Sequence, residues 1–284
     1  MRIWFVLLVV PALLLGILFP RGADGGDPAI KVVNLEKLNS DADEEDPCPT
    51  PDHLGLLYAS KSRGSYDILI SKRTLLTSPF NAGKLFIFDK AADERAPFMH
   101  KDKYYFATNE IRDKKFEKIK NFDLMMQIGF QAPLFVSGDI NSRDDEMYPW
   151  VTPAGKELYF SRKVDGGWKL FVANGPVPGP IGVAKSVGFE KGFHRATIGG
   201  NSLTMYLQGP LENDKIGIFR SKRAKVGEKW SDPEPVKALN HAQSTKGDMQ
   251  PAVTQDGTRL YLVSDRPGGK GGLDIWYVTT ASLK

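Results

Sequence analysis

The sequence predicts an all-β protein, a β-propeller of five blades with four antiparallel strands in each blade. Three observations predict this fold. A unit of two strand-like segments joined by a tight turn recurs along the chain, and no segment after the N-terminal apolar run has the pattern of a long helix. In addition, the 284 residues include 28 Gly and 19 Pro, as expected for many short strands joined by turns.

The composition excludes several classes of protein. The chain is 41% hydrophobic and 25% charged, which is ordinary for a globular protein and not for a largely disordered one. A net charge of +4 spread over this length offers no footprint for nucleic acid. The single cysteine, Cys48, excludes a disulfide framework and a thiolate cluster, and the four histidines lack metal-ligand spacing. We therefore expect no cofactor, no metal and no nucleic-acid partner.

The N-terminus has the pattern of an export signal. Arg2 precedes an apolar run over residues 3–19, and small residues follow it around Ala23 and Gly25. Residues 1–25 are predicted to be a cleaved signal peptide or, alternatively, an N-terminal membrane anchor through residues 3–19. Either way, the protein is expected to be periplasmic or secreted, with residues 26–284 forming a single propeller domain.

The repeat is clearest near the C-terminus, where residues 251–261 read Pro-Ala-Val-Thr-Gln-Asp-Gly-Thr-Arg-Leu-Tyr, and residues 149–159 carry a second copy. Three further copies complete the set, and the equivalent tyrosines of all five are spaced by 47, 54, 47 and 55 residues, at Tyr58, Tyr105, Tyr159, Tyr206 and Tyr261. This is close to the period of a four-stranded propeller blade. The predicted repeats span approximately residues 44–73, 94–127, 146–174, 193–223 and 248–280.

Each copy has a simple physical interpretation. Pro-x-x-Thr predicts a short innermost strand, whose proline stands where a missing N–H is tolerated. Asp-Gly or Ala-Gly predicts a tight turn, and Leu-Tyr predicts a half-buried second strand. Asp-Ile-Trp at residues 274–276 begins a third strand, and residues 230–240 are typical of a fourth.

The N-terminal part of this domain is expected to close the ring. Residues 30–40 resemble the connector between two blades that ends at residues 239–241. The last copy of the repeat supplies only three strands. A strand from residues 30–40 would complete the last blade and remove its exposed edge. The five copies of the repeat predict five blades. A propeller of six blades is the alternative, if residues 176–185 contain further, degenerate strands.

These motifs also resemble a known family. Pro-x-x-Thr-x-Asp-Gly-x-x-Leu-Tyr, followed by Ser-Asp-Arg-Pro-Gly-Gly and Asp-Ile-Trp, is similar to the WD-like β-propeller repeat of TolB-type exported proteins. The resemblance covers nearly all of residues 30–280. It implies an exported propeller that acts as a protein-interaction or ligand-binding scaffold, with another envelope or secreted protein, a glycan or a small ligand as partner. It does not imply an enzyme.

The candidate binding residues lie at the start of each predicted innermost strand. An acid stands three residues before the repeated proline in four copies, at Glu44, Glu94, Glu146 and Asp248. The fourth copy breaks this pattern and carries the basic pair His194 and Arg195 instead. Such a ring at the channel mouth could bind a cation, a basic peptide or a polyol. Alternatively, each acid hydrogen-bonds backbone within its own blade, because a repeated residue is often explained by repeated structure.

Other features leave further alternatives open. Residues 95–105 are similar to a strand of five-bladed glycoside hydrolases, although Ala96 replaces the aspartate before proline that those enzymes use. Asp46 precedes Pro47 in the first copy, so a propeller hydrolase using channel carboxylates is the alternative function. The basic stretch 112–120 could contact an anionic surface or form a solvated loop. Tryptophans could stack on sugars or pack between blades, at positions Trp150, Trp168, Trp230 and Trp276.

Overall fold

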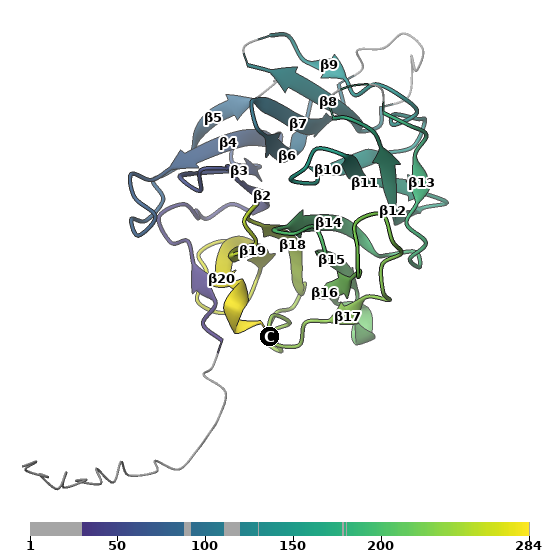
Figure 1. The fold of residues 1–284 in the computed structure, drawn as a ribbon. Helices are drawn as coiled ribbons and strands as arrows, with labels where there is room; N and C mark the ends of the chain where they lie inside the picture. The colour runs from purple at the N-terminus through teal and green to yellow at the C-terminus, as the bar shows by residue number, and fades with distance from the viewer. Residues whose placement is uncertain are drawn as a thin grey trace, which may run out of the picture.

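The computed structural model describes residues 30–87, 92–110, 120–129, 131–177, 179 and 181–283. Within these ranges, five four-stranded antiparallel sheets surround a central axis, as Figure 1 shows. The predicted five-bladed β-propeller is therefore confirmed. The six-blade alternative is wrong, because the segment that could have hidden a sixth blade leads into the fourth strand of blade 3, β13 (Lys185–Ser186).

Each blade runs from its innermost to its outermost strand in chain order, except for the last. Blade 1 contains β2 (Glu44–Pro49), β3 (Gly55–Ser60), β4 (Asp67–Lys72) and β5 (Lys84–Ile87). Blade 2 contains β6 (Glu94–His100), β7 (Lys103–Thr108), β8 (Asp123–Ile128) and β9 (Leu134–Phe135). Blade 3 contains β10 (Glu146–Val151), β11 (Glu157–Val164), β12 (Gly167–Asn174) and β13.

The remaining blades complete the ring. Blade 4 contains β14 (His194–Gly199), β15 (Thr204–Pro210), β16 (Ile216–Lys222) and β17 (Glu234–Pro235), and blade 5 contains β18 (Asp248–Val253), β19 (Arg259–Ser264) and β20 (Asp274–Thr279). Among the described residues, short 3₁₀ turns occur at η2 (Glu212–Asp214) and η3 (Thr280–Ser282).

The N-terminal strand closes the ring as predicted. β1 (Val33–Asn34) pairs antiparallel with β20, and the two ends of the colour scale meet there in Figure 1. Asn39 reinforces this closure, because its side chain donates to the carbonyl of Ile275 at 2.9 Å and accepts from the N–H of Ile275 at 2.9 Å. The outer edge of blade 5 is thereby paired.

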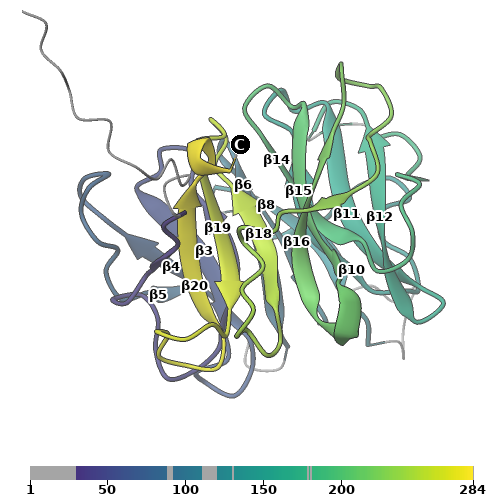
Figure 2. The ribbon, with the colours of Figure 1, turned by 90° about the horizontal axis from the view of Figure 1, so that it is seen from below.

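The blades pack through large apolar side chains. Trp150 illustrates this packing, because its ring centroid lies 4.5 Å from that of Phe98 in blade 2 and its Nε1 donates to the carbonyl of Ile198 in blade 4. The prediction that this tryptophan packs between blades is confirmed. We call the end at which the innermost strands begin the mouth face, and the end at which they finish the far face; Figure 2 shows the blades from the side.

The innermost strands share one irregularity. The register of each with its neighbour shifts at the same place in the strand. The residue at each shift has a left-handed backbone with φ between 52° and 60°, at Asp46, Ala96, Tyr148, Arg195 and Gln250. This conformation costs an L-residue about 1 kcal/mol or more, and a following proline disfavours it further. Strained residues of this kind concentrate at functional sites, so these five residues mark a candidate site.

Two predictions lie outside the described residues: the signal peptide or anchor at residues 1–25, and the basic stretch except for Lys120. Among the helices in the part of the chain that the structure describes, none has the length and hydrophobicity to cross a membrane.

Candidate functional site

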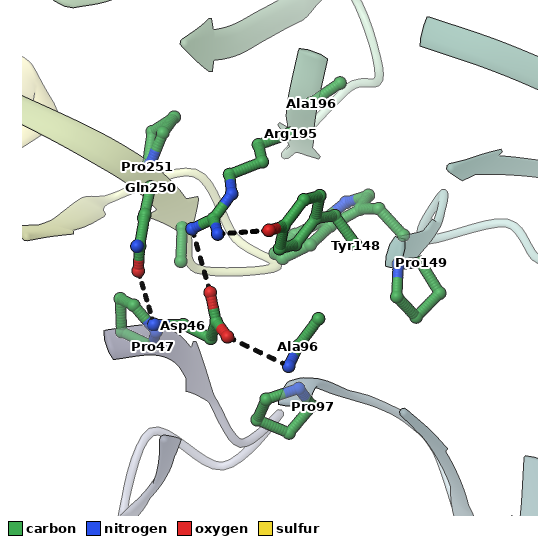
Figure 3. A pocket seen from close by; sticks show the side chains of 12 residues that line it. Asp46, Pro47, Ala96, Pro97, Tyr148, Pro149, Arg195, Ala196, Gln250 and Pro251 are labelled. Atoms are coloured by element: carbon green, nitrogen blue, oxygen red, sulfur yellow. Dashed lines mark hydrogen bonds and ion pairs between the residues drawn. The ribbon is translucent and has the colours of Figure 1, made fainter. Parts of the chain in front are cut away.

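The left-handed residues of the five blades converge on the axis. Together with the residues that follow them, they line a cavity of about 40 Å³ (Figure 3). The left-handed residue is followed by proline in blades 1, 2, 3 and 5 and by alanine in blade 4. These five side chains make part of the cavity lining apolar. This space accommodates only a few water molecules, whereas sites for organic ligands occupy roughly 300–1,000 Å³.

Asp46 is the carboxylate in this cavity, and two arginines hold it. Its Oδ2 accepts from Arg95 Nε at 2.9 Å and from the backbone N–H of Ala96 at 3.1 Å. Its Oδ1 lies 2.8 Å from Arg195 Nη1. Blade 1 is therefore tied to blade 2 and, across the axis, to blade 4.

The arginines decide the charge of Asp46. Burial alone would raise the pKa of its carboxyl, but the positive charges of Arg95 and Arg195 outweigh burial and hold the pKa below its ordinary value. The carboxylate is consequently ionised at neutral pH. A general acid needs a raised pKa, so Asp46 is unsuited to donate a proton.

Arg195 crosses the axis and stacks on an aromatic ring. Its Cζ lies 3.6 Å from the centroid of the Tyr148 ring, and its Nη2 donates to the Tyr148 hydroxyl. The contact with Asp46 lacks the alignment of a hydrogen bond, so Arg195 Nε and Nη1 and Asp46 Oδ1 are buried with hydrogen-bonding capacity to spare. These polar atoms are suited to hold a small polar group.

A second ion pair lies beside the first. Arg95 Nη2 donates to Glu45 Oε2 at 2.5 Å, and the Tyr66 hydroxyl donates to Glu45 Oε1 at 2.5 Å. The Arg95 guanidinium lies 4.1 Å from the centroid of the Tyr66 ring. Half-buried Tyr66 thus covers Arg95 at the mouth face.

A chain of hydrogen bonds links blades 4, 5 and 1. Gln208 Nε2 lies 3.1 Å from His194 Nε2, and Gln208 Oε1 accepts from the N–H of Gln250 at 3.0 Å. Gln250 Oε1 accepts from the N–H of Asp46 at 2.5 Å, while its Nε2 donates to Glu45 at 2.7 Å. The orientation of Asp46 therefore depends on three blades at once.

The predicted acids occupy a different position. All four are buried, with exposed fractions of 0–2%, and the structure does not bring them together in the cavity. Glu44 accepts from the N–H and hydroxyl of Ser40, and Glu146 accepts from those of Ser142. Asp248 accepts from the N–H of His241 at 2.6 Å. Glu94 accepts from the hydroxyl of Thr108 in its own blade. Such contacts are expected from the alternative interpretation, in which the repeated acids stabilise repeated structure.

Two of the acids also pair with arginine, Glu146 with a residue of the neighbouring strand and Asp248 with a residue just after it. Glu146 Oε1 accepts from Arg162 Nε at 2.7 Å, and Asp248 Oδ1 accepts from Arg266 Nη2 at 2.6 Å. Burial nevertheless raises the pKa of Glu146 to about 7. A binding role for the four acids stays a prediction, and their partners favour a structural role.

His194 and Arg195 are neighbours with different surroundings. Arg195 lines the cavity, whereas His194 is buried, stacks on Trp168 with ring centroids 5.6 Å apart, and contacts the Gly192 carbonyl through Nδ1 at 2.8 Å. Burial and the positive charge of Arg195 lower the pKa of His194 to about 3. The ring is therefore neutral in the folded protein.

We expect His194 to make the protein sensitive to acid. Between its ordinary pKa of 6.5 and its folded pKa of about 3, the unfolded chain binds one more proton at this ring than the folded chain. Its contribution to the free energy of unfolding should therefore fall on acidification, by up to about 1.4 kcal/mol per pH unit. Urea unfolding at pH 7 and pH 5 measures this loss, and His194→Gln should remove part of it. Identical pH dependence in both proteins would contradict the assignment.

Tyr148 and Gln250 are among the site residues that the sequence analysis missed. The signal that marks them is their place directly before the repeated proline, since the acids stand two residues earlier. Within the described ranges, no group of three or more His, Cys, Asp or Glu side chains is arranged to hold a metal ion.

No protein-family model matches the chain, and no curated protein is significantly similar to it in sequence. Solved structures share its fold. The catalytic domain of a GH62 α-L-arabinofuranosidase from Coprinopsis cinerea has a TM-score of 0.58 and 10% identity, over 88% of this chain and 97% of that chain. An endo-arabinase from Bacteroides thetaiotaomicron has a TM-score of 0.55 and 13% identity, over 89% of this chain and 97% of that chain.

TolB from Acinetobacter baumannii is also similar, with a TM-score of 0.52 and 14% identity over 84% of this chain and 54% of that chain. At such low identities these likenesses show the propeller fold alone. They do not separate a TolB-type scaffold from a hydrolase.

Proposed function

We propose that this chain is a non-catalytic, exported propeller that recognises a partner protein at its mouth face. The observation that carries the proposal is the set of residues at the axis, where the cavity lining holds one carboxylate, Asp46, in contact with two arginines. Export rests on the pattern of residues 1–25, and the scaffold role on the TolB-type repeat.

The residues around the mouth suit protein recognition. Tyr66, Tyr148 and Trp168 are half-buried there, and Arg95 and Arg195 are stacked on two of these rings. Tyr, Trp and Arg are the side chains that most often dominate binding energy in protein interfaces. Because the stacking and ion pairs hold them in place before binding, little side-chain entropy is lost when a partner docks.

Loss of the Trp168 side chain should weaken partner capture at least tenfold. The test is cross-linking capture from the native extracytoplasmic extract, comparing wild type with Trp168→Ala. Val226→Ala is the matched control, because Val226 is 53% exposed and lies in the outer loop of blade 4 on the far face. A partner retained by wild type and by the control but lost by folded Trp168→Ala supports the proposal. Equal capture by all three proteins contradicts it.

Glycoside hydrolysis is the second candidate, favoured by the fold of the GH62 and arabinase neighbours and by Asp46 before Pro47. The reaction requires two carboxyl groups on either side of the scissile bond, separated by about 5–9.5 Å. Glu45 adjoins Asp46 on one strand and is held by the same Arg95, so the two acids approach from one side. A cavity of about 40 Å³ also leaves no room for a sugar ring at the axis. We therefore favour recognition.

A further inference from the structure

The outer loops of blades 1 and 4 are built alike on the far face. In each, Ser-Lys-Arg leads from the third strand into the loop, at residues 71–73 and 221–223, and the arginine lies over an aromatic ring of that loop. The Arg73 Cζ is 4.5 Å from the centroid of the Phe80 ring, and the Arg223 Cζ is 4.3 Å from that of Trp230.

Both arginines are anchored in the same way. Arg73 donates through Nε and Nη2 to the carbonyl of His53 at 2.9 and 2.7 Å, and Arg223 donates through Nε to the carbonyl of Ser202 at 2.9 Å. His53 and Ser202 stand at equivalent turns and share a left-handed backbone, with φ of 59° and 61°. The two guanidinium groups therefore occupy equivalent positions.

Their neighbours across the blade junction differ in charge. Arg223 binds Glu157 of blade 3 through both terminal nitrogens, at 2.8 and 2.7 Å. In blade 5, Arg259 occupies the position that Glu157 has in blade 3. The backbone carbonyl of Glu157 accepts from the N–H of Thr152, and that of Arg259 accepts from the N–H of Thr254. Between blades 5 and 1, a second arginine thus stands where the carboxylate would be.

This junction concentrates positive charge in a partly apolar groove. Arg73 is 9% exposed, and in the part of the chain that the structure describes neither Arg73 nor Arg259 forms an ion pair with a carboxylate. The Tyr261 hydroxyl contacts both guanidinium groups. Burial, and to a smaller extent Arg259, lower the pKa of Arg73. An anion at this place would be bound by charge-assisted hydrogen bonds.

The groove has room for more than an ion. Its volume is about 520 Å³, and its lining adds Lys37 and several apolar side chains, namely Val33, Leu35, Leu76, Pro79 and Phe80. Exposed Glu36 also lines it without pairing with either arginine. The combination of buried Arg73, half-buried Arg259 and an aliphatic wall matches a carboxylate on an apolar body.

We propose that the groove between blades 5 and 1 binds a carboxylate carried on an aliphatic body, and that this carboxylate serves Arg73 as the counter-ion that Glu157 provides for Arg223 between blades 3 and 4. The site lies on the far face and does not depend on recognition at the mouth. Its ligand is either a free organic acid or the carboxyl terminus of a peptide, which share this chemistry.

Isothermal titration of the full chain with N-acetyl-leucine tests the proposal. N-acetyl-leucinamide, which lacks the charge, should bind at least tenfold more weakly, and Arg259→Gln should weaken N-acetyl-leucine binding at least tenfold. A peptide ending in leucine that binds more tightly than N-acetyl-leucine identifies a carboxyl terminus as the source, and equal affinities identify a small acid. No heat of binding from N-acetyl-leucine, or equal binding of the amide, would overturn the proposal, as would tighter binding of inorganic phosphate.

Arg259→Glu provides a second, independent test. It recreates the Arg223–Glu157 arrangement at the junction between blades 5 and 1, so the variant should fold, unfold at a higher temperature than wild type without ligand, and no longer bind N-acetyl-leucine. Wild-type affinity for N-acetyl-leucine in Arg259→Glu would show that the anion does not use this place and would overturn the proposal.

Discussion

Replacing Asp46 by alanine is expected to lower the free energy of unfolding by about 3–5 kcal/mol, because it leaves Arg195 buried without a carboxylate and Arg95 paired with Glu45 alone. The backbone adds to this loss, since Asp46 has a φ of 54° and alanine tolerates a left-handed conformation less well than aspartate. Guanidinium unfolding at neutral pH measures the change.

Two further variants separate the causes of this loss. Asp46→Asn keeps a side chain that tolerates the left-handed backbone and removes only the charge, so its loss should be smaller than that of Asp46→Ala. Asp41→Ala removes an exposed acid from the connector that precedes β2 and should change the free energy by less than about 0.5 kcal/mol. A loss below about 1 kcal/mol in Asp46→Ala would refute the view that the two arginines depend on this carboxylate.

Arg223→Ala is expected to have a similarly large effect, again about 3–5 kcal/mol. Arg223 and Glu157 form a two-bond ion pair with side chains 1% and 8% exposed, so removal of the arginine leaves a carboxylate buried without its cation. The loss of stacking on Trp230 adds to this effect. Thermal and urea unfolding provide the measurement.

A matched pair of variants isolates the charge. Lys222→Ala removes an exposed cation from the adjacent position and should be nearly neutral. The double variant Arg223→Met with Glu157→Leu replaces both charges by apolar side chains and should recover most of the lost stability. If the double variant is as unstable as Arg223→Ala, the cause is lost packing rather than an unpaired carboxylate.

The blades are predictable from the sequence because each copy must repeat the same local structure. The tyrosines at positions such as Tyr159 and Tyr261 recur because each is buried between strands in the same place, with 1% exposure in both. The closing strand is predictable for a related reason, since the last copy lacks a fourth strand and an unpaired edge is unfavourable.

The candidate site is predictable only in part. The acids Glu44 and Glu146 stand out because they repeat, and they repeat because they hold the connectors of their own blades. The axis residues Tyr148 and Gln250 do not repeat, since each makes a different contact with another blade. Their place directly before the repeated proline can be seen in the sequence, but only the register shift puts that place at the axis, and register depends on the paired strand.

Whether the mouth face recognises a ligand or hydrolyses one is tested most directly by a turnover measurement. The purified chain is incubated with xylo-, cello- and arabino-oligosaccharides, and released reducing ends are counted beside those from Asp46→Asn. We predict no release above that of the variant, because Asp46 is held by two arginines and no second carboxylate faces it across the cavity lining that the structure describes. Turnover by the wild type that disappears in folded Asp46→Asn would contradict a recognition site and establish a hydrolase.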